Sequence, residues 1–400
     1  MNDKKLTICL VSSGFPPEDA GGIGTYIHNL SAGLHSQGHK VVVITKSKEQ
    51  EGREDFNGVT VYRYKTRYIP KLEKFLPGLA WSRFVAKTIS ALDKEFRFDI
   101  IEFPNWEGVG FVYLLKRGRK PVAVRVHTPY FETLSIDSGE KNISWGDRFI
   151  CWLEEQSCRK ADTLVSSTVC HQNLIVNQYH LNAGQIKILP LGIDLQGPEI
   201  TTHTSNGMIN VLYVSRLEKR KGTLTLLNAI PRIAEEIKNV RFTIIGRDRP
   251  HAPDNRLYKE FFEAEHPGQK DRVNFLGFIS SEELERHYQK SDVFVVPSVY
   301  ESFGLIYVEA MKYGKPVIGC WAGGIPEVID EGKTGFLVEP NDEQGLAEKV
   351  ITLLKDEGLR RQMGAQARRH CEEKFSRQRM ASDTARHYAD TIGKRDGSKV

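Results

Sequence analysis

The chain has 400 residues with a formal net charge of +5, and 40% of its residues are hydrophobic and 27% charged. This length suits two domains better than one core, and the mild charge makes nucleic acid a poor candidate for a partner. No apolar run approaches the roughly 20 residues that span a bilayer, and the first run, 6–11, is too short for the core of a signal peptide. We therefore expect a cytoplasmic protein.

Short apolar runs alternate with helical stretches along the chain. Because these runs are uniformly apolar, they predict parallel strands covered by helices on both faces. In the first half the predicted strands are 6–11, 41–45, 59–63, 100–103, 122–126, 163–166 and 186–189. In the second half they are 210–215, 241–245, 273–276, 293–297, 316–319 and 335–338. The pattern predicts an α/β protein with two doubly wound domains.

A stretch rich in Gly, Thr, Ser and Asn, 191–208, separates the two sets of strands and indicates an interdomain linker. We expect a first domain at 1–195 and a second at 209–375, joined by the linker 196–208. The polar tail 376–400 is too hydrophilic to found a domain, so we expect its helix to pack on one already built. Ligands of parallel sheets bind beyond the carboxyl ends of the strands, which predicts a cleft between the domains.

Four basic residues precede the predicted helix 223–236: Arg216, Lys219, Arg220 and Lys221. Positive side chains at a helix N-terminus oppose the helix dipole, so the cluster calls for an explanation. A bound diphosphate would supply it through charge-assisted hydrogen bonds and free helix amides. A solvated basic loop is the alternative.

Two glutamates, Glu301 and Glu309, are eight positions apart, which would set them about 80° out of register on one continuous helix. They converge only if a loop intervenes, and Ser302-Phe303-Gly304 predicts one, followed by a helix that starts at Leu305 with free amides. Glu309 then lies among apolar neighbours, where a ribose diol would supply the donors that a buried carboxylate needs. An equally good local interpretation is a solvent-facing Glu309 paired with Lys312.

The first half has a glycine loop and a histidine at predicted strand ends. Gly21-Gly22-Ile23-Gly24 opens a helix, and its backbone suits close approach to a phosphate or sugar ring, although it lacks the full G-x-G-x-x-G spacing. A flexible turn is the alternative there. His127 follows the strand 122–126 at the carboxyl end, where a functional role competes with a structural one.

Glu102, Asn105 and Trp106 follow the strand 100–103 and are candidates to face an acceptor. The ring of Trp106 suits stacking on a sugar, and equally well ordinary packing.

A basic and aromatic stretch, 68–94, carries Trp81, Val85, Ile89 and Leu92 on one predicted helical face. Such a helix either rests on an anionic membrane or covers a sheet.

No Asp-x-Asp pair and no Cys-x-x-Cys pair occurs in the sequence. Paired carboxylates are what a transferase needs to hold a diphosphate through Mg²⁺, whereas Arg216 and Lys221 neutralise leaving-group charge directly. We therefore expect metal-independent chemistry with no metal site.

These motifs together resemble the family-4 retaining glycosyltransferases of GT-B fold. The resemblance spans essentially the whole chain and rests on 21–24, His127, 214–222, 273–278, 297–298 and 301–309. It implies two Rossmann-like domains facing a central cleft, with a C-terminal helix that returns to the first domain. It also implies a nucleotide-sugar donor held mainly by the second domain.

The resemblance implies roles for single residues. Glu309 corresponds to the acid that binds the donor ribose, Glu301 to the acid at the donor sugar, and Arg216 and Lys221 to the diphosphate clamp. His127 would contact the donor sugar near the reaction centre. The candidate catalytic residues are therefore His127, Arg216, Lys221 and Glu301.

The backbone near Phe278 would meet the nucleotide base. The remaining donor contacts that the resemblance implies come from backbone groups, of Gly21 and Gly22 in the first domain and of Phe303, Gly304 and Leu305 in the second. One segment departs from the family pattern, because many members carry Gly-x-Gly-Pro where this chain has Gly246-Arg-Asp-Arg-Pro250.

We expect a retaining, metal-independent glycosyltransferase without a cofactor, with UDP-glucose as donor. The expected acceptor is a glycan or lipid-linked molecule of polysaccharide or glycolipid synthesis, with peripheral contact at the inner face of the cytoplasmic membrane. Two alternatives stay open: a nucleotide-sugar epimerase of the same fold, and a non-catalytic nucleotide-sugar-binding protein.

Overall fold

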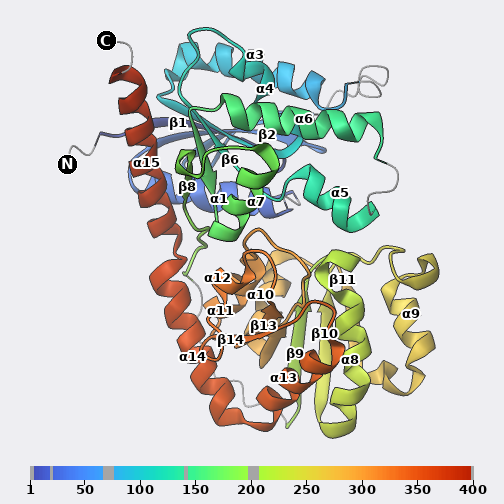
Figure 1. The fold of residues 1–400 in the computed structure, drawn as a ribbon. Coiled ribbons are helices and arrows are strands. Elements are labelled where there is room, and N and C mark those ends of the chain that lie inside the picture. The colour runs from blue at the N-terminus through green and yellow to red at the C-terminus, as the bar shows by residue number, and fades with distance from the viewer. Residues whose placement is uncertain (1–3, 19–20, 66–75, 139–142, 197–206, 398–400) are drawn as a thin grey trace. The chain divides into compact units, whose positions relative to one another are not determined.

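The computed structural model describes residues 4–18, 21–65, 76–138, 143–196 and 207–397. The chain forms two compact units, one of Met1–Asp194 with Ser376–Val400 and the other of Leu195–Phe375. Each unit is built around a sheet of mostly or wholly parallel strands with helices around it (Figure 1). Within the described ranges, no helix is long and apolar enough to cross a membrane.

The described part of the first unit has an eight-stranded sheet in the order β3-β4-β2-β1-β5-β6-β7-β8. All neighbouring strands run parallel except β3 and β4. The strands are β1 (Thr7–Ser12), β2 (Lys40–Ser47), β3 (Gly52–Phe56), β4 (Val59–Lys65), β5 (Ile100–Pro104), β6 (Val122–Arg125), β7 (Thr163–Ser166) and β8 (Ile186–Ile188). The strands predicted in this half are thus confirmed, and β3 is an addition.

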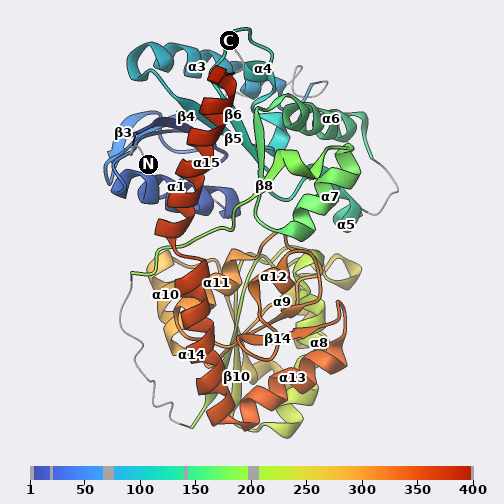
Figure 2. The same ribbon diagram turned by 60° about the vertical axis from the view of Figure 1, so that its left-hand side comes forward.

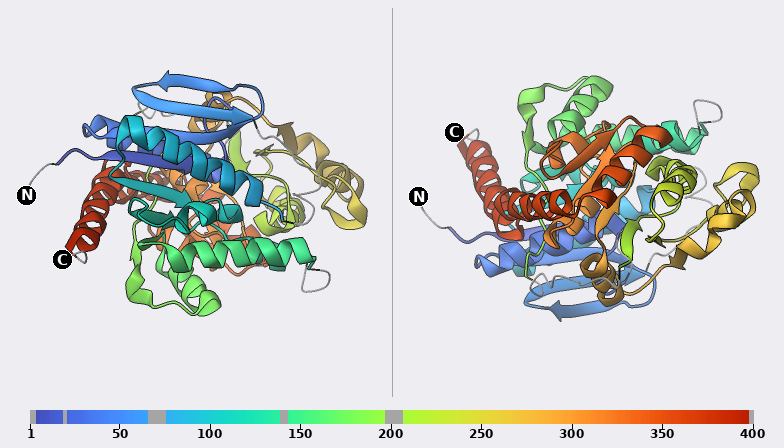
Figure 3. Two further views of the ribbon diagram at one scale, coloured as in Figure 1. Left: turned by 90° about the horizontal axis from the view of Figure 1, so that it is seen from above. Right: turned by 90° about the horizontal axis from the view of Figure 1, so that it is seen from below.

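Strand β3 is polar and largely exposed, so it has no apolar run by which to be recognised. It forms the sheet edge with β4, drawn in blue in Figure 3. Asn57 and Gly58, which connect the two strands, both have positive φ, of 53° and 81°. An Asn-Gly pair between strands is the signal of a type I′ hairpin, and this signal was overlooked in the sequence.

The helices of the first unit are α1 (Gly21–Ser36), α3 (Leu79–Phe96), α4 (Phe111–Leu114), α5 (Tyr130–Ser138), α6 (Trp145–Lys160), α7 (Val169–Tyr179) and α15 (Arg377–Gly397). The C-terminal helix α15 packs along α1 (Figure 2). Gly33 of α1 permits this approach, because a Cβ there would lie 2.8 Å from the Cβ of Ala381.

Helix α3 includes most of the described part of the basic and aromatic stretch 68–94; residues 68–75 lie outside the described ranges. Trp81, Val85 and Ile89 are buried in the core beneath this helix, with Leu92 packed against them. The described part of the stretch is therefore a helix that covers the sheet.

The second unit has a six-stranded parallel sheet in the order β11-β10-β9-β12-β13-β14. Its strands are β9 (Ile209–Val214), β10 (Val240–Ile245), β11 (Val273–Gly277), β12 (Val293–Val295), β13 (Val317–Cys320) and β14 (Gly335–Val338). Its helices are α8 (Thr223–Glu236), α9 (Tyr258–Glu265), α10 (Ser281–Lys290), α11 (Leu305–Lys312), α12 (Ile325–Val328), α13 (Glu343–Lys355) and α14 (Glu357–Lys374). The helices predicted at 223–236 and from Leu305 are confirmed.

The strand order reverses between β9 and β12 in the second unit. The chain builds outward from β9 through β10 to β11 and then returns to the other side of β9 with β12. Ligands of open parallel sheets bind at such a switch point, beyond the carboxyl ends of the two central strands. The loop after β9 carries the basic cluster and the loop after β12 carries Glu301, so the topology brings the two motifs to one place.

Candidate functional site

The loops that follow β9 and β12 are locked together by a glycine. Gly222 has φ of 62°, and a Cβ at this position would overlap the carbonyl oxygen of Pro297. The amide of Val299 also donates to the carbonyl of Arg220 at 3.0 Å. Only glycine accommodates both the positive φ and the close approach, so the separation of the two loops is fixed by the sequence.

A buried ion pair links the two loops. Nζ of Lys221 donates a hydrogen bond to Oε1 of Glu301, and Nη1 of Arg220 lies 3.7 Å from the other carboxylate oxygen. Oγ of Ser298 donates to Oε1 at 3.2 Å. Burial would raise the pKa of Glu301, but the charges of Lys221 and Arg220 hold it below its usual value. Burial lowers the pKa of Lys221 in turn, and the charge of Glu301 opposes that shift.

The basic cluster has a second carboxylate that the sequence analysis overlooked. Oε1 of Glu218 lies 3.1 Å from Nη2 of Arg220 and 3.2 Å from Nη2 of Arg216. We expected these cations to need an external anion, but Glu218 neutralises part of their charge. Three cations, Arg216, Arg220 and Lys221, face two carboxylates, Glu218 and Glu301, which leaves one more positive than negative group at the switch point.

Arg216 is the cation best placed to meet a ligand. Its side chain is 54% exposed, whereas those of Arg220 and Lys221 are 9% and 11% exposed. Its ion pair with Glu218 uses one terminal nitrogen, so the guanidinium keeps further donors in a fork geometry that suits phosphate oxygens.

The helix after the loop of Glu301 begins without a side-chain cap. Gly304 is the N-cap residue of α11 with φ of 94°, and as a glycine it has no side chain to accept from the first amides. A Cβ on Gly304 would lie 2.6 Å from Cδ2 of Tyr307, so glycine is required here too. The loop places Phe303 in the core and leaves Leu305 partly exposed. Free amides at a helix start attract an anion, and α8, behind Gly222, begins uncapped as well.

Glu309 lies in α11, one turn beyond its start, with its carboxylate held by a tyrosine. The hydroxyl of Tyr288, in α10, donates to Oε2 of Glu309 at 3.0 Å. Lys312, the partner considered from the sequence, lies instead 4.0 Å from Glu285. Burial raises the pKa of Glu309 above its usual value. Its other oxygen, Oε1, has no hydrogen-bond partner among the described residues and is available to a ligand diol.

The segment that departs from the family pattern borders a cavity. Gly246 has φ of 148°, and a Cβ there would overlap the carbonyl oxygen of Ser215. Phe278, just after β11, is 62% exposed, with the guanidinium of Arg247 4.8 Å from its ring centroid. A cavity of about 530 Å³ lies beside these loops, bounded by Leu217, Gly246 and Gly277 among others. The ring of Phe278 thus lies at the surface, at the end of the edge strand β11.

In the first unit, the backbone of His127 is hydrogen-bonded and its ring packs against another aromatic ring. Its amide donates to Oδ1 of Asn105 at 2.8 Å, and its ring packs 5.3 Å from that of Tyr26. Burial, aided by Arg125 and His171, lowers the pKa of His127 to about 3. Nε2 is buried and has no hydrogen-bond partner. The imidazole is therefore neutral near pH 7 and offers one unused nitrogen.

The structure places Glu102 and Asn105 in the core, which corrects the expectation that they face an acceptor. Glu102 is 1% exposed and accepts from the hydroxyls of Tyr26 at 2.7 Å and Tyr388 at 2.6 Å, with Arg125 3.8 Å away. Glu102 belongs to β5, whose residues are buried throughout, so it anchors α1 and α15. Asn105 is fully buried and positions the His127 backbone.

The other two first-unit motifs are more open. Trp106 is partly exposed and packs against Tyr130, with ring centroids 5.7 Å apart. Gly21 and Gly22 are exposed at the start of α1, and a Cβ on either would have no neighbour within 4 Å. Close packing within the described residues is therefore not the reason for glycine at these two positions. Among the described residues, no group of three or more His, Cys, Asp or Glu side chains is placed to hold a metal ion.

Two family models match the chain. The model of the glycosyl transferase 4-like domain matches residues 21–192, and that of glycosyl transferases group 1 matches residues 203–370. An uncharacterized glycosyltransferase of Methanocaldococcus jannaschii is 28% identical over 96% of this chain and 98% of its own.

Solved structures share the fold. The sucrose-phosphate synthase of Thermosynechococcus elongatus matches with a TM-score of 0.78 at 23% identity, over 98% of this chain and all of that chain. HepE of Anabaena, in complex with UDP-glucose, matches with a TM-score of 0.71 at 21% identity, over 96% and 100% of the two chains.

Proposed function

Because the chain belongs to the glycosyl transferases group 1 family and has the GT-B fold, we propose that it transfers a hexose from a nucleoside diphosphate sugar with retention of anomeric configuration. UDP-glucose is the proposed donor, and HepE, of the same fold, has been solved with that molecule. The proposed acceptor is a glycan or a lipid-linked molecule. The predicted cytoplasmic location and membrane contact stay predictions.

The observation that carries the proposal is the buried pair of Lys221 and Glu301 beside the exposed guanidinium of Arg216. A diphosphate placed between Arg216, Lys221 and the start of α11 would meet two cations and uncapped amides. The carboxylate of Glu301 would then be free to accept from a hydroxyl of the transferred sugar. Glu309 would accept from a ribose hydroxyl through Oε1, while Tyr288 holds Oε2.

Transfer would proceed at the face from which the diphosphate leaves. The bond between the anomeric carbon and the phosphate oxygen breaks, the acceptor oxygen bonds to the anomeric carbon on the same face, and the acceptor proton passes to a phosphate oxygen. Arg216, Lys221 and the α11 amides stabilise the charge that develops on the diphosphate. This chemistry requires neither a side-chain nucleophile nor a metal ion.

The neutral state of His127 restricts what it would contribute. An imidazole with a pKa of about 3 is no general acid near pH 7, so its proposed role is a hydrogen bond with a donor-sugar hydroxyl through the unused nitrogen. Asn105 and Tyr26 position the ring for this contact.

Product analysis tests the proposal. The protein is incubated with UDP-glucose in the presence of EDTA, with and without a mixture of glucan and polyprenyl phosphate acceptors, and proton NMR reports the products. We expect transfer only when acceptor is present, with an α-linkage. A changed sugar with donor alone would identify an epimerase, and binding without turnover would identify a non-catalytic protein; either result would reject the proposal.

A further inference from the structure

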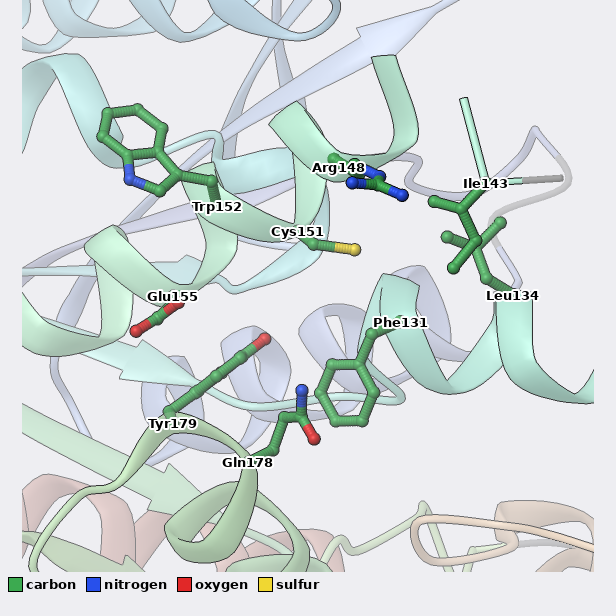
Figure 4. A pocket seen from close by; sticks show the side chains of 9 residues that line it. All are labelled: Phe131, Leu134, Ile143, Arg148, Cys151, Trp152, Glu155, Gln178 and Tyr179. Carbon is green, nitrogen blue, oxygen red and sulfur yellow. The ribbon is translucent and has the colours of Figure 1, made fainter. Parts of the chain in front are cut away.

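The second cavity of the protein lies in the first unit, and its lining residues have no role in the proposed donor site. It lies between α5, α6 and α7 and has a volume of about 290 Å³. Its walls are mainly apolar, formed by Phe131, Leu134, Ile143, Cys151, Trp152 and the ring of Tyr179 (Figure 4). This is the lower end of the size range of small-molecule pockets, enough for part of an extended chain.

One polar group inside this wall has no partner. Tyr179 is only 2% exposed, yet its hydroxyl is buried without a hydrogen bond. Burial raises the pKa of this phenol far above its usual value, so the hydroxyl always carries its proton. In Figure 4 it points from α7 toward the space in front of Cys151 and Phe131. A buried hydroxyl normally has a partner, so an oxygen acceptor on a bound molecule would complete this wall.

The cavity opens beside a row of aromatic rings on α6. Trp145 and Phe149 stack with centroids 5.3 Å apart, and Phe149 and Trp152 with centroids 5.8 Å apart. Phe111, from α4, meets the edge of Trp152 at 5.3 Å. Trp145 and Trp152 are 60% and 45% exposed. Trp152 belongs to both the row and the cavity lining, so the row lies beside the cavity on α6.

The rim carries one uncompensated positive charge. Arg148 lines the cavity and forms no ion pair with any described residue. Glu155, the acidic residue of the lining, is paired with Arg159 at 2.7 Å. An arginine at the mouth of an apolar cavity suits a phosphate attached to a hydrocarbon chain.

We propose that this cavity binds the hydrocarbon chain of a single phosphate-bearing lipid, the acceptor of the transfer reaction. The chain fills the space between α5 and α7, Arg148 meets the phosphate, and the hydroxyl of Tyr179 donates to an oxygen of the lipid. A bilayer surface would cover the aromatic row but would leave Tyr179 unpaired. The inference rests on the proposed function for the acceptor's role, whereas binding itself is measurable without any donor.

The test uses alkyl phosphates at monomeric concentrations, titrated into the full chain by calorimetry. We expect decyl phosphate to bind far more tightly than ethyl phosphate, with a gain of about fourfold for each methylene group until the cavity is full. Tyr179→Phe should weaken binding about two- to tenfold without lowering the unfolding temperature, because it removes an unpaired buried hydroxyl. Cys151→Trp, which fills the cavity, should abolish binding.

The control is Trp321→Ala, which removes a tryptophan of similar exposure, 48%, from the second unit and should leave binding unchanged. Equal affinity for ethyl and decyl phosphate, or wild-type affinity in both Tyr179→Phe and Cys151→Trp, would overturn the proposal. A third result would also overturn it: decyl phosphate binds neither the wild type nor Cys151→Trp, while phosphatidylglycerol vesicles bind both proteins equally well. UDP-glucose binding, followed in the same variants, reports separately on the donor site.

Discussion

Nζ of Lys221 and Oε1 of Glu301 form a hydrogen-bonded ion pair between residues 80 positions apart in the sequence. The pair joins the loops after the two central strands of the second unit, at the reversal of its strand order. A charged pair at this depth is costly to desolvate, so it is weak evidence for stability and better evidence for a function. In the proposed enzyme it keeps a cation ready for the diphosphate and a carboxylate ready for the sugar.

Gly222, which allows the close approach of these two loops, should contribute strongly to the stability of the protein. Gly222→Ala places a Cβ against the Pro297 carbonyl at a positive φ, and should destabilise the protein by more than about 2 kcal/mol. Gly268→Ala is the control, because a Cβ there meets nothing within 4 Å. Urea unfolding of both variants measures the difference. Equal stability of the two variants would show that the loops are not locked as described.

Donor affinity should depend on the protonation of Glu309. Burial raises the pKa of this carboxyl above the usual 4.5, and only the carboxylate accepts two hydrogen bonds from a diol. UDP affinity should therefore rise with pH through the window above pH 4.5 in the wild type. It should be lower and flatter in Glu309→Gln, with exposed Glu282→Gln as control. A parallel pH dependence in all three proteins would exclude Glu309 from the ribose site.

The depressed pKa of His127 predicts a loss of stability in mild acid. Below pH 6.5 the unfolded imidazole takes up a proton that the folded one refuses down to about pH 3. This residue alone should then reduce the free energy of unfolding by up to about 1.4 kcal/mol per pH unit as the pH falls through that window. His127→Asn should flatten the pH dependence, and exposed His180→Asn should not. Unfolding curves at pH 7 and pH 5 measure the pH dependence of both variants. An equal pH dependence in both would contradict this assignment to His127.

The C-terminal helix should depend on a single hydroxyl for part of its anchoring. Tyr388→Phe leaves the buried carboxylate of Glu102 with the Tyr26 hydroxyl as its remaining short hydrogen bond. The loss should be about 1–3 kcal/mol in the free energy of unfolding, because a buried acceptor loses one of its hydrogen-bond partners. UDP affinity should stay near the wild-type value, because Arg216, Lys221 and Glu309, the proposed contacts of the diphosphate and ribose, belong to the other unit. Loss of UDP binding in a folded variant would contradict this separation.

The sequence predicted elements whose signals are local. Gly304 ahead of an apolar run predicted the start of α11, and uniformly apolar runs predicted the buried strands. It failed where a residue's partner is distant. Glu218 and Tyr288 became visible only once β9, α10 and α11 were packed together. Glu102 looked like a strand-end residue free to meet an acceptor, but its side chain is buried between α1 and α15.

The resemblance to a known family assigned roles to the site residues, and the structure adds what holds them. The local choice between a ribose contact and a Lys312 pair at Glu309 was open in the sequence, and Tyr288 is the group found at that carboxylate. The glycines at 222 and 304 fix the loops for reasons of backbone geometry that no composition reveals.

The clamp itself is tested most directly by calorimetric titration of UDP in the presence of EDTA. The account predicts binding by the wild type and by Lys219→Ala, whose lysine is exposed. It predicts a loss of tenfold or more in Lys221→Ala, which should remain folded because Arg220 still faces Glu301. Wild-type affinity in folded Lys221→Ala, or binding that disappears when EDTA is added, would contradict a metal-independent clamp at this site.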